Sequence, residues 1–247
     1  MDGVLIEGGR MVPGADKFLD KLRQCGRDFL VLTNNAFFTP AELHRRLIEM
    51  GLELREDQIW TSALATAQFV HDQHPGGSAF VIGEASVHEA LAKQGYTEDS
   101  LHPDYVVLGE TWDYSRDEIT TAIRLIEKGC KFVATNPETH GSSPEGLLPG
   151  TGALAALIQS VTDVRPYFVG KPNPVMIRDA LNIVGAHSQT TVMVGDRMDT
   201  DVLAGVEAGV ETILVLSGFT KREDIDKFIC QPSRVVNSIA DLIDEVV

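Results

Sequence analysis

The stretch Phe29-Leu30-Val31-Leu32-Thr33-Asn34-Asn35 is a short apolar run that ends abruptly in polar residues. An apolar run of this length without alternation is typical of a strand that is buried on both faces of a parallel sheet. Apolar residues at helical spacing precede it in 15–24 and follow it in 40–50, and Gly26 and Gly51 stop the two helices. This alternation predicts a Rossmann-like, doubly wound parallel α/β sheet, whose ligands gather at the carboxyl ends of the strands.

The alternation continues in two blocks, which Pro75-Gly76-Gly77 separates as a linker. The second block has its own strands and helices, and the first resumes with the strand 167–172. We therefore predict a discontinuous core domain of residues 1–77 and 167–247, with an inserted α/β cap domain of residues 78–166. The further strands are expected at 79–83, 105–109, 131–136, 191–196 and 212–218, the helices at 63–71, 87–94, 116–128, 153–161, 175–184, 201–209 and 239–247, and a loop rich in Gly, Pro and Ser at 137–152.

The composition restricts the kinds of partner. The formal net charge of −15 argues against nucleic acid, because binding to phosphate backbones needs clustered Lys and Arg. No segment approaches the roughly 20 apolar residues of a membrane span, and the N-terminus has no secretory signal pattern. The 3 cysteines lie far apart, as in a protein with reduced thiols. We expect a cytoplasmic protein with neither nucleic acid nor membrane as partner.

Charged or hydrogen-bonding residues lie at the ends of the predicted strands and in the N-terminal turn. They are Asp2, Thr33-Asn34, Lys171, and Asp196 with Asp201. Parallel strands place their carboxyl ends on one edge of the sheet, so these residues are expected to converge. Together they offer carboxylates for a hard cation such as Mg²⁺, donors for phosphate oxygens, and a lysine. Phosphoryl transfer needs these groups. A metal and a lysine would also let so acidic a chain accept an anionic substrate.

Each of these residues alone has an ordinary structural explanation. Asp2-Gly3 fits a common turn, and Lys171 before Pro172 fits a solvated loop. Asp196 and Asp201 fit helix caps. Their joint occurrence at strand ends favours the functional interpretation.

The motifs that contain these residues resemble those of a known family. The sequence around these residues looks like the four motifs of the haloacid dehalogenase superfamily, and more narrowly the NagD-like phosphatases, with residues 78–166 as their large α/β cap. The resemblance runs nearly end to end. The residues that carry it are Asp2-Gly3-Val4, Leu32-Thr33-Asn34-Asn35, Val169-Gly170-Lys171-Pro172, Gly195-Asp196-Arg197-Met198-Asp199-Thr200-Asp201, Thr61-Ser62-Ala63, Ala134-Thr135-Asn136-Pro137, His140-Gly141 and Pro149-Gly150-Thr151-Gly152.

The resemblance implies roles for the core residues. Asp2 would be the general acid/base, with its backbone carbonyl on Mg²⁺. Lys171 would neutralise charge on the nucleophile and the phosphate. Asp196 would ligate the metal, and Asp201 would support the metal's water shell. The phosphate oxygens would be held by Thr33, Asn34 and Asn35.

In the cap, the resemblance implies substrate-specificity contacts from Asn136, Thr139 and His140. His140 fits equally well a loop histidine that touches no ligand. The resemblance also implies a homodimer and a small phosphorylated metabolite as the partner.

The chain departs from the family at its nucleophile. The family has an aspartate two residues before the acid/base aspartate, on the same face of the strand, whereas only Met1 precedes Asp2 here. This pattern suggests a start read one methionine late, a truncated chain or, less readily, evolutionary loss. We therefore expect impaired catalysis and lower stability of the chain as given.

The sequence thus predicts an enzyme that hydrolyses nucleoside monophosphates or sugar phosphates with Mg²⁺ through an aspartyl-phosphate. The alternative is a non-catalytic protein of the same fold that binds a phosphorylated ligand for regulation. A Rossmann oxidoreductase is less favoured, because no GxGxxG follows a strand.

Overall fold

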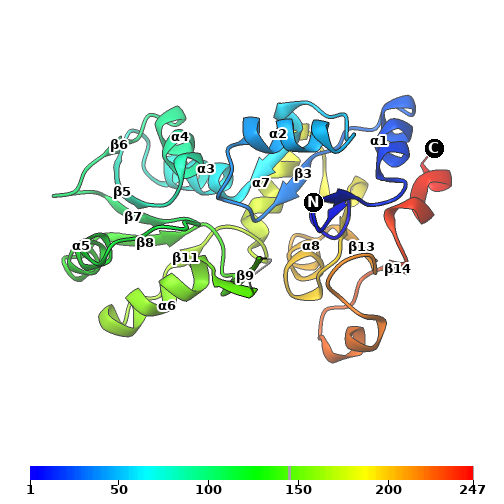
Figure 1. The fold of residues 1–247 in the computed structure, drawn as a ribbon. Coiled ribbons are helices and arrows are strands. Elements are labelled where there is room, and N and C mark those ends of the chain that lie inside the picture. The colour runs from blue at the N-terminus through cyan, green and yellow to red at the C-terminus, as the bar shows by residue number, and fades with distance from the viewer. Residues whose placement is uncertain (144–145, 247) are drawn as a thin grey trace. The chain divides into compact units, whose positions relative to one another are not determined.

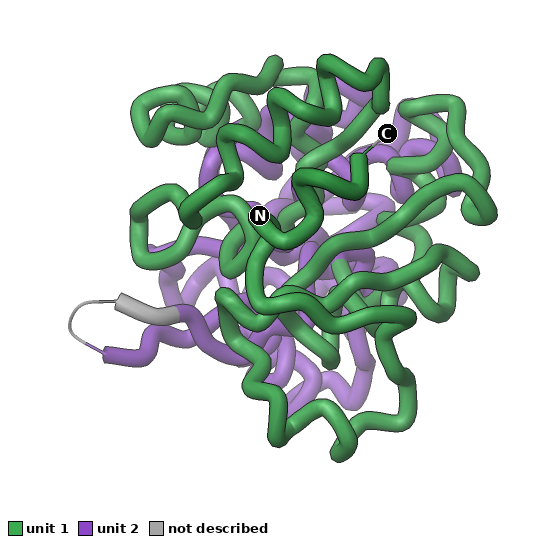
Figure 2. Tube along the Cα trace, turned by 90° about the vertical axis from the view of Figure 1, so that its right-hand side faces the viewer, with its two compact units in different colours: residues 1–33, 40–60, 171–247 green, residues 34–39, 61–170 purple. Residues whose placement is uncertain are grey.

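The computed structural model describes residues 1–143 and 146–246, and it confirms the predicted α/β class (Figure 1). Its contacts divide the chain into two discontinuous units (Figure 2). Unit 1 contains Met1–Thr33, Pro40–Trp60 and Lys171–Val247, and unit 2 contains Asn34–Thr39 and Thr61–Gly170.

Unit 2 is built on a parallel sheet of 5 strands. The strands lie in the order β11 (Tyr167–Phe168), β8 (Lys131–Ala134), β7 (Tyr105–Leu108), β5 (Ser78–Ile82) and β6 (Thr97–Glu98). The helices are α3 (Ser62–Gln73), α4 (Ala85–Lys93), α5 (Arg116–Glu127) and α6 (Thr151–Thr162). Helices α3 and α4 lie on one side of the sheet, and α5 and α6 on the other (Figure 1).

Helix α5 shows why this unit folds as it does. Its apolar residues Ile119, Ala122, Leu125 and Ile126 recur at helical spacing and are all buried against the sheet and α6. At its start, the Ser115 hydroxyl accepts the Glu118 N–H at 3.1 Å, and the Glu118 carboxylate accepts the Ser115 N–H at 2.7 Å. This capping box fixes the first residue of the helix.

The prediction of a plain loop over 137–152 is wrong. The segment contains an antiparallel pair, β9 (His140–Ser143) with β10 (Gly146–Pro149), in which His140 lies opposite Pro149. Residues 144–145 lie outside the described residues. Gly, Pro and Ser have low strand propensity, so the pairing of the two segments, and not their composition, makes these strands.

Unit 1 contains the parallel strands β12 (Val192–Gly195), β13 (Glu211–Val215) and β14 (Arg234–Val236), in that order. A second ladder joins β3 (Val31–Thr33) to β4 (Ile59–Thr61), whose last residue belongs to unit 2. A small hairpin pairs β1 (Ile6–Glu7) with β2 (Arg10–Met11). The helices are α1 (Ala15–Gln24), α2 (Pro40–Glu49), α7 (Pro174–Val184) and α8 (Leu203–Glu207), and the 3₁₀ turns are η1 (Glu56–Gln58), η2 (Ser188–Thr190), η4 (Arg222–Lys227) and η5 (Ile239–Glu245).

Two helices of unit 1 differ from prediction. The helix expected at 201–209 is a π-helical turn, η3 (Met198–Val202), followed by the short α8, so Asp201 lies inside a turn and not at an N-cap. The Asp201 side chain bonds Lys171 and the Asp196 N–H instead of capping a helix. The C-terminal helix expected at 239–247 is the 3₁₀ turn η5.

The unit boundaries also differ from the predicted domain boundaries. Residues 61–77 fall in unit 2, because the Tyr96 hydroxyl donates to the carbonyls of Val70 and His74, at 2.7 and 2.6 Å, and so ties the end of α3 to this unit. Strand β11 also falls in unit 2, because it pairs in parallel with β8. The assignment of core and cap roles to the two units stays a prediction.

Candidate active site

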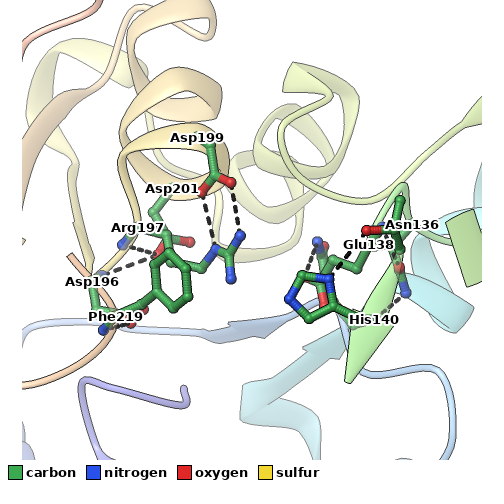
Figure 3. A network of polar contacts seen from close by, with 10 residues as sticks. Asn136, Glu138, His140, Asp196, Arg197, Asp199, Asp201 and Phe219 are labelled. Atoms are coloured by element: carbon green, nitrogen blue, oxygen red, sulfur yellow. Dashed lines mark hydrogen bonds and ion pairs between the residues drawn. The ribbon is translucent and has the colours of Figure 1, made fainter. Parts of the chain in front are cut away.

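The turn after β12 is held together by two buried carboxylates. Asp196 directly follows the strand, and its Oδ2 accepts the backbone N–H of Phe219 at 2.8 Å. Asp201 reaches back from η3, and its Oδ2 accepts the N–H groups of Asp196 and Arg197 at 3.0 and 3.2 Å (Figure 3). Because these bonds fix the backbone, they also fix the direction of the Asp196 side chain.

Lys171 forms a buried ion pair with Asp201. Its Nζ lies 2.7 Å from Asp201 Oδ1, and the two side chains are only 8% and 6% exposed. Burial alone would raise the pKa of Asp201, but the Lys171 ammonium and the Met1 amine outweigh it, so the pKa lies below its ordinary value. Asp201 is therefore ionised and forms its ion pair with Lys171.

The pKa of Asp196 is shifted in the opposite direction. Burial, and secondly the charge of Asp201, raise the pKa of Asp196 to about 6. A Cβ at Gly3 or Gly218 would lie 2.3 Å from Asp196 Oδ2, so the two glycines keep the space beside this oxygen open. Oxygen donors with excess negative charge and open space fit a hard cation such as Mg²⁺. Within the described residues, no three His, Cys, Asp or Glu side chains gather as ligands of one ion.

The N-terminal turn belongs to unit 1, and its Met1 amine lies near Lys171, Asp196 and Asp201. The Met1 amine donates to the Leu32 carbonyl on β3 at 3.4 Å, and the Ser217 hydroxyl donates to the Gly3 carbonyl at 2.7 Å. Asp2, which is exposed, forms an isolated parallel bridge with Ile6.

Charged side chains from several segments lie near the Met1 amine. Burial, and then the Lys171 ammonium, lower the pKa of the Met1 amine, while three carboxylates oppose the shift. Unit 1 thus gathers four of the predicted site residues, Asp2, Lys171, Asp196 and Asp201. Thr33 is buried at the end of β3 in the same unit.

In unit 2, Asn34 is held by a network of polar contacts. Its carbonyl accepts the Ser62 hydroxyl at 2.6 Å and the Asn136 side-chain amide at 2.9 Å. Its own side-chain amide donates to Glu138 Oε1 at 3.0 Å. The Glu138 N–H donates to Asn136 Oδ1 at 3.1 Å (Figure 3). Asn136 is fully buried, so in this structure it positions Asn34 and Glu138.

The remaining predicted residues differ in accessibility. Thr139 and His140 are exposed, with the Thr139 hydroxyl 3.2 Å from His140 Nδ1, and they are open to a ligand. The Asn35 Oδ1 accepts the Phe38 N–H at 3.0 Å, which closes a local turn. Their roles toward a substrate stay predictions.

Sequence reasoning missed Ser62, Glu138 and Glu110. Glu110 follows Gly109 at the end of β7, and its Oε2 accepts the Ala36 N–H at 2.7 Å. A polar residue at the end of a buried parallel strand is the signal that located Asp196, and the same signal could have found Glu110.

Comparison with known proteins identifies the family. A family model described as haloacid dehalogenase-like hydrolase matches residues 1–97, and one described as HAD-hydrolase-like matches residues 168–242. A dihydroxyacetone phosphatase of Corynebacterium glutamicum is 52% identical over 244 residues, which cover 99% of this chain and 89% of the relative. The chain belongs to the haloacid dehalogenase-like hydrolases.

Within this family the chain is similar to NagD. The ribonucleotide monophosphatase NagD of Escherichia coli K12 is 42% identical over 98% of this chain and 95% of its own length. The solved structure of NagD from that strain matches with a TM-score of 0.94 and 41% identity, covering 100% of this chain and 97% of the NagD chain. These matches confirm the resemblance predicted from the motifs, and the chain is an enzyme of the phosphatase type that acts on phosphate monoesters. No helix among the described residues is long and apolar enough to span a bilayer.

Proposed function

We propose that this hydrolase acts on small phosphate monoesters with Mg²⁺. The observation that supports it best is the buried group of Lys171, Asp201 and Asp196 near the end of β12, in which Lys171 pairs with Asp201 and Asp196 lies beside them. An isolated buried carboxylate is costly, and a divalent cation beside Asp196 would offset that cost.

Mg²⁺ would be held by the Asp196 carboxylate and the Asp2 backbone carbonyl, with Asp201 supporting its water shell. When bound, it would neutralise charge on the phosphate oxygens. Lys171 would add a second positive charge, held in place by Asp201 at 2.7 Å. Thr33 and Asn34 would donate hydrogen bonds to phosphate oxygens.

Asp2 would donate a proton to the leaving oxygen and then take one from the attacking water. The family nucleophile is a carboxylate two residues before this aspartate, and residues 1–247 hold no such group. We infer that the polypeptide of residues 1–247 turns over slowly by itself, and that an aspartate placed directly before Met1 supplies the nucleophile.

The relatives suggest which monoesters to test first. The dihydroxyacetone phosphatase is the relative with 52% identity, and NagD, a ribonucleotide monophosphatase, has 42%. We propose dihydroxyacetone phosphate and other sugar phosphates as first candidates, and nucleoside monophosphates as second. The exposed Thr139 and His140 would contact the part of the substrate that differs between sugar phosphates and nucleoside monophosphates.

The test measures phosphate release from a panel of these monoesters, with Mg²⁺ or with EDTA. It compares the chain 1–247 with a chain that carries an aspartate before Met1. We expect Mg²⁺-dependent turnover by the extended chain and little by the shorter one. Robust turnover by residues 1–247 would contradict the proposed mechanism, and phosphate binding without turnover by both chains would favour the regulatory alternative.

A further inference from the structure

Glu110 is a largely buried, partly accessible carboxyl group that the proposed chemistry does not use. It lies in unit 2 and follows Gly109 at the end of β7, and its backbone carbonyl accepts the Glu84 N–H at 3.1 Å. Its side chain turns toward residues 34–39, the segment that begins with Asn34. Isolated carboxyl groups are rarely buried, because leaving water is costly, so the contacts of this one need a reason.

The contacts of Glu110 fix the backbone of the 34–39 segment. Its Oε2 accepts the Ala36 N–H at 2.7 Å, and the Phe37 N–H also hydrogen-bonds to it. The Ala36 carbonyl accepts the hydroxyl of Ser86. The N–H and the carbonyl of Ala36, two residues after Asn34, are therefore both hydrogen-bonded.

The same carboxyl group is linked to the other side of Asn34. The Asn136 side chain hydrogen-bonds to Glu110 and donates to the Asn34 carbonyl at 2.9 Å. Glu110 thus holds the 34–39 segment at Ala36 directly and at Asn34 through Asn136. A hydrogen bond to an ionised carboxylate is about twice as strong as a neutral one.

We propose that Glu110 is a positioning residue that fixes the 34–39 segment through Ala36 and Asn136, and thereby sets the direction of the Asn34 side chain. This inference rests on the proposed function, which assigns Asn34 to the substrate phosphate. Glu110 acts through Asn34 and does not touch the substrate.

The charge of Glu110 changes near neutral pH. Burial raises the pKa of Glu110 to about 7, and the nearby Glu138 adds to the rise. Glu84, on a neighbouring segment, also carries a carboxylate, which accepts the Thr111 hydroxyl at 3.0 Å. Since the folded segment raises this pKa, it binds the proton more tightly than an opened segment does, so the segment opens more readily as the pH rises through 7.

The test is amide hydrogen exchange of the full chain, read for a peptide that contains residues 34–39, in wild type, Glu110→Ala and Glu110→Gln. A lost hydrogen bond to a charged group should speed exchange in Glu110→Ala about 10- to 100-fold in this peptide. Glu110→Gln keeps an acceptor, so it should retain most of the protection but lose its change with pH near 7. The exposed Glu89 on α4 provides the matched control Glu89→Gln, which should exchange like wild type.

Kinetics of the chain with an added aspartate give the second readout. Glu110→Ala should raise KM about 10-fold or more, with a smaller change in kcat. Because phosphate esters themselves titrate near pH 6, the ratio of wild type to Glu110→Gln at each pH is the quantity compared.

Unchanged exchange at 34–39 in Glu110→Ala would overturn the inference, and so would an equal loss of protection throughout β7 and α5, which indicates a general structural role. If every variant, wild type included, fails to turn over, the proposed function fails. The exchange data still decide whether Glu110 holds the segment.

Discussion

The buried pair of Lys171 and Asp201 gives the sharpest stability prediction. Each side chain is under 10% exposed, at 8% and 6%, and the Nζ to Oδ1 distance is 2.7 Å. Lys171→Met leaves Asp201 as an uncompensated buried charge, and Asp201→Asn does the same to Lys171. Breaking a buried pair from one side costs about 3–5 kcal/mol of unfolding free energy.

The double variant separates this charge effect from simple loss of packing. Lys171→Met with Asp201→Asn removes both charges together, so no unpaired ion is left. We expect it to lose less unfolding free energy than the sum of the two single variants, with a coupling of about 1–3 kcal/mol.

The assay is urea unfolding followed by circular dichroism, with EDTA present so that no divalent cation contributes. The control is Glu245→Gln, which breaks the pair of Arg234 and Glu245 on the surface, where both side chains are 44% exposed. An exposed pair contributes about 0–1 kcal/mol, so this variant should unfold nearly like wild type. Additive losses in the double variant, or single losses as small as the control's, would show that the two charges do not stabilise each other.

Three further predictions concern other parts of the chain. Ser115→Ala removes the N-cap of α5 and should lower the unfolding free energy by about 1 kcal/mol in urea unfolding, with Ser160→Ala on α6 as the control. Gly218→Ala places a Cβ 2.3 Å from Asp196 Oδ2 and 2.6 Å from Gly3 Cα, so turnover of the extended chain should fall about 100-fold, and unchanged turnover would contradict the described site. Burial raises the pKa of Glu110 from its ordinary value of 4.5 to about 7 in the folded chain. Its contribution to stability is therefore present below pH 4.5 and is lost as the pH rises through 7. The loss is at most about 3 kcal/mol, and urea unfolding at pH 5 and pH 8 should show it in wild type and not in Glu110→Gln.

The sequence predicted best the features that local patterns determine. Val31–Thr33 and Val192–Gly195 are short apolar runs, and both form parallel strands whose ends carry Thr33 and Asp196. The convergence of Lys171 with Asp201 also followed from the parallel topology, because strand ends share one edge of a sheet.

Features that depend on distant partners could not be predicted. The π-helical turn at Met198–Val202 contains Asp201, which bonds Lys171, 30 residues away in the sequence, and a helix pattern does not contain that information. The specificity role of Asn136 stays a prediction, but its burial and its bond to the Asn34 carbonyl, 102 residues away, could not be read from the sequence. Glu110 was missed because its importance comes from Ala36, on a segment far away in the sequence.

The most direct test of the account is the rate of phosphate release from dihydroxyacetone phosphate by the chain with an aspartate before Met1, measured with Mg²⁺, with EDTA, and in Lys171→Met. We expect Mg²⁺-dependent turnover that falls about 100- to 1,000-fold in Lys171→Met, because one group that stabilises developing charge is removed. Turnover that persists in EDTA, or is unchanged in Lys171→Met, would contradict the central role of the charged group at the end of β12.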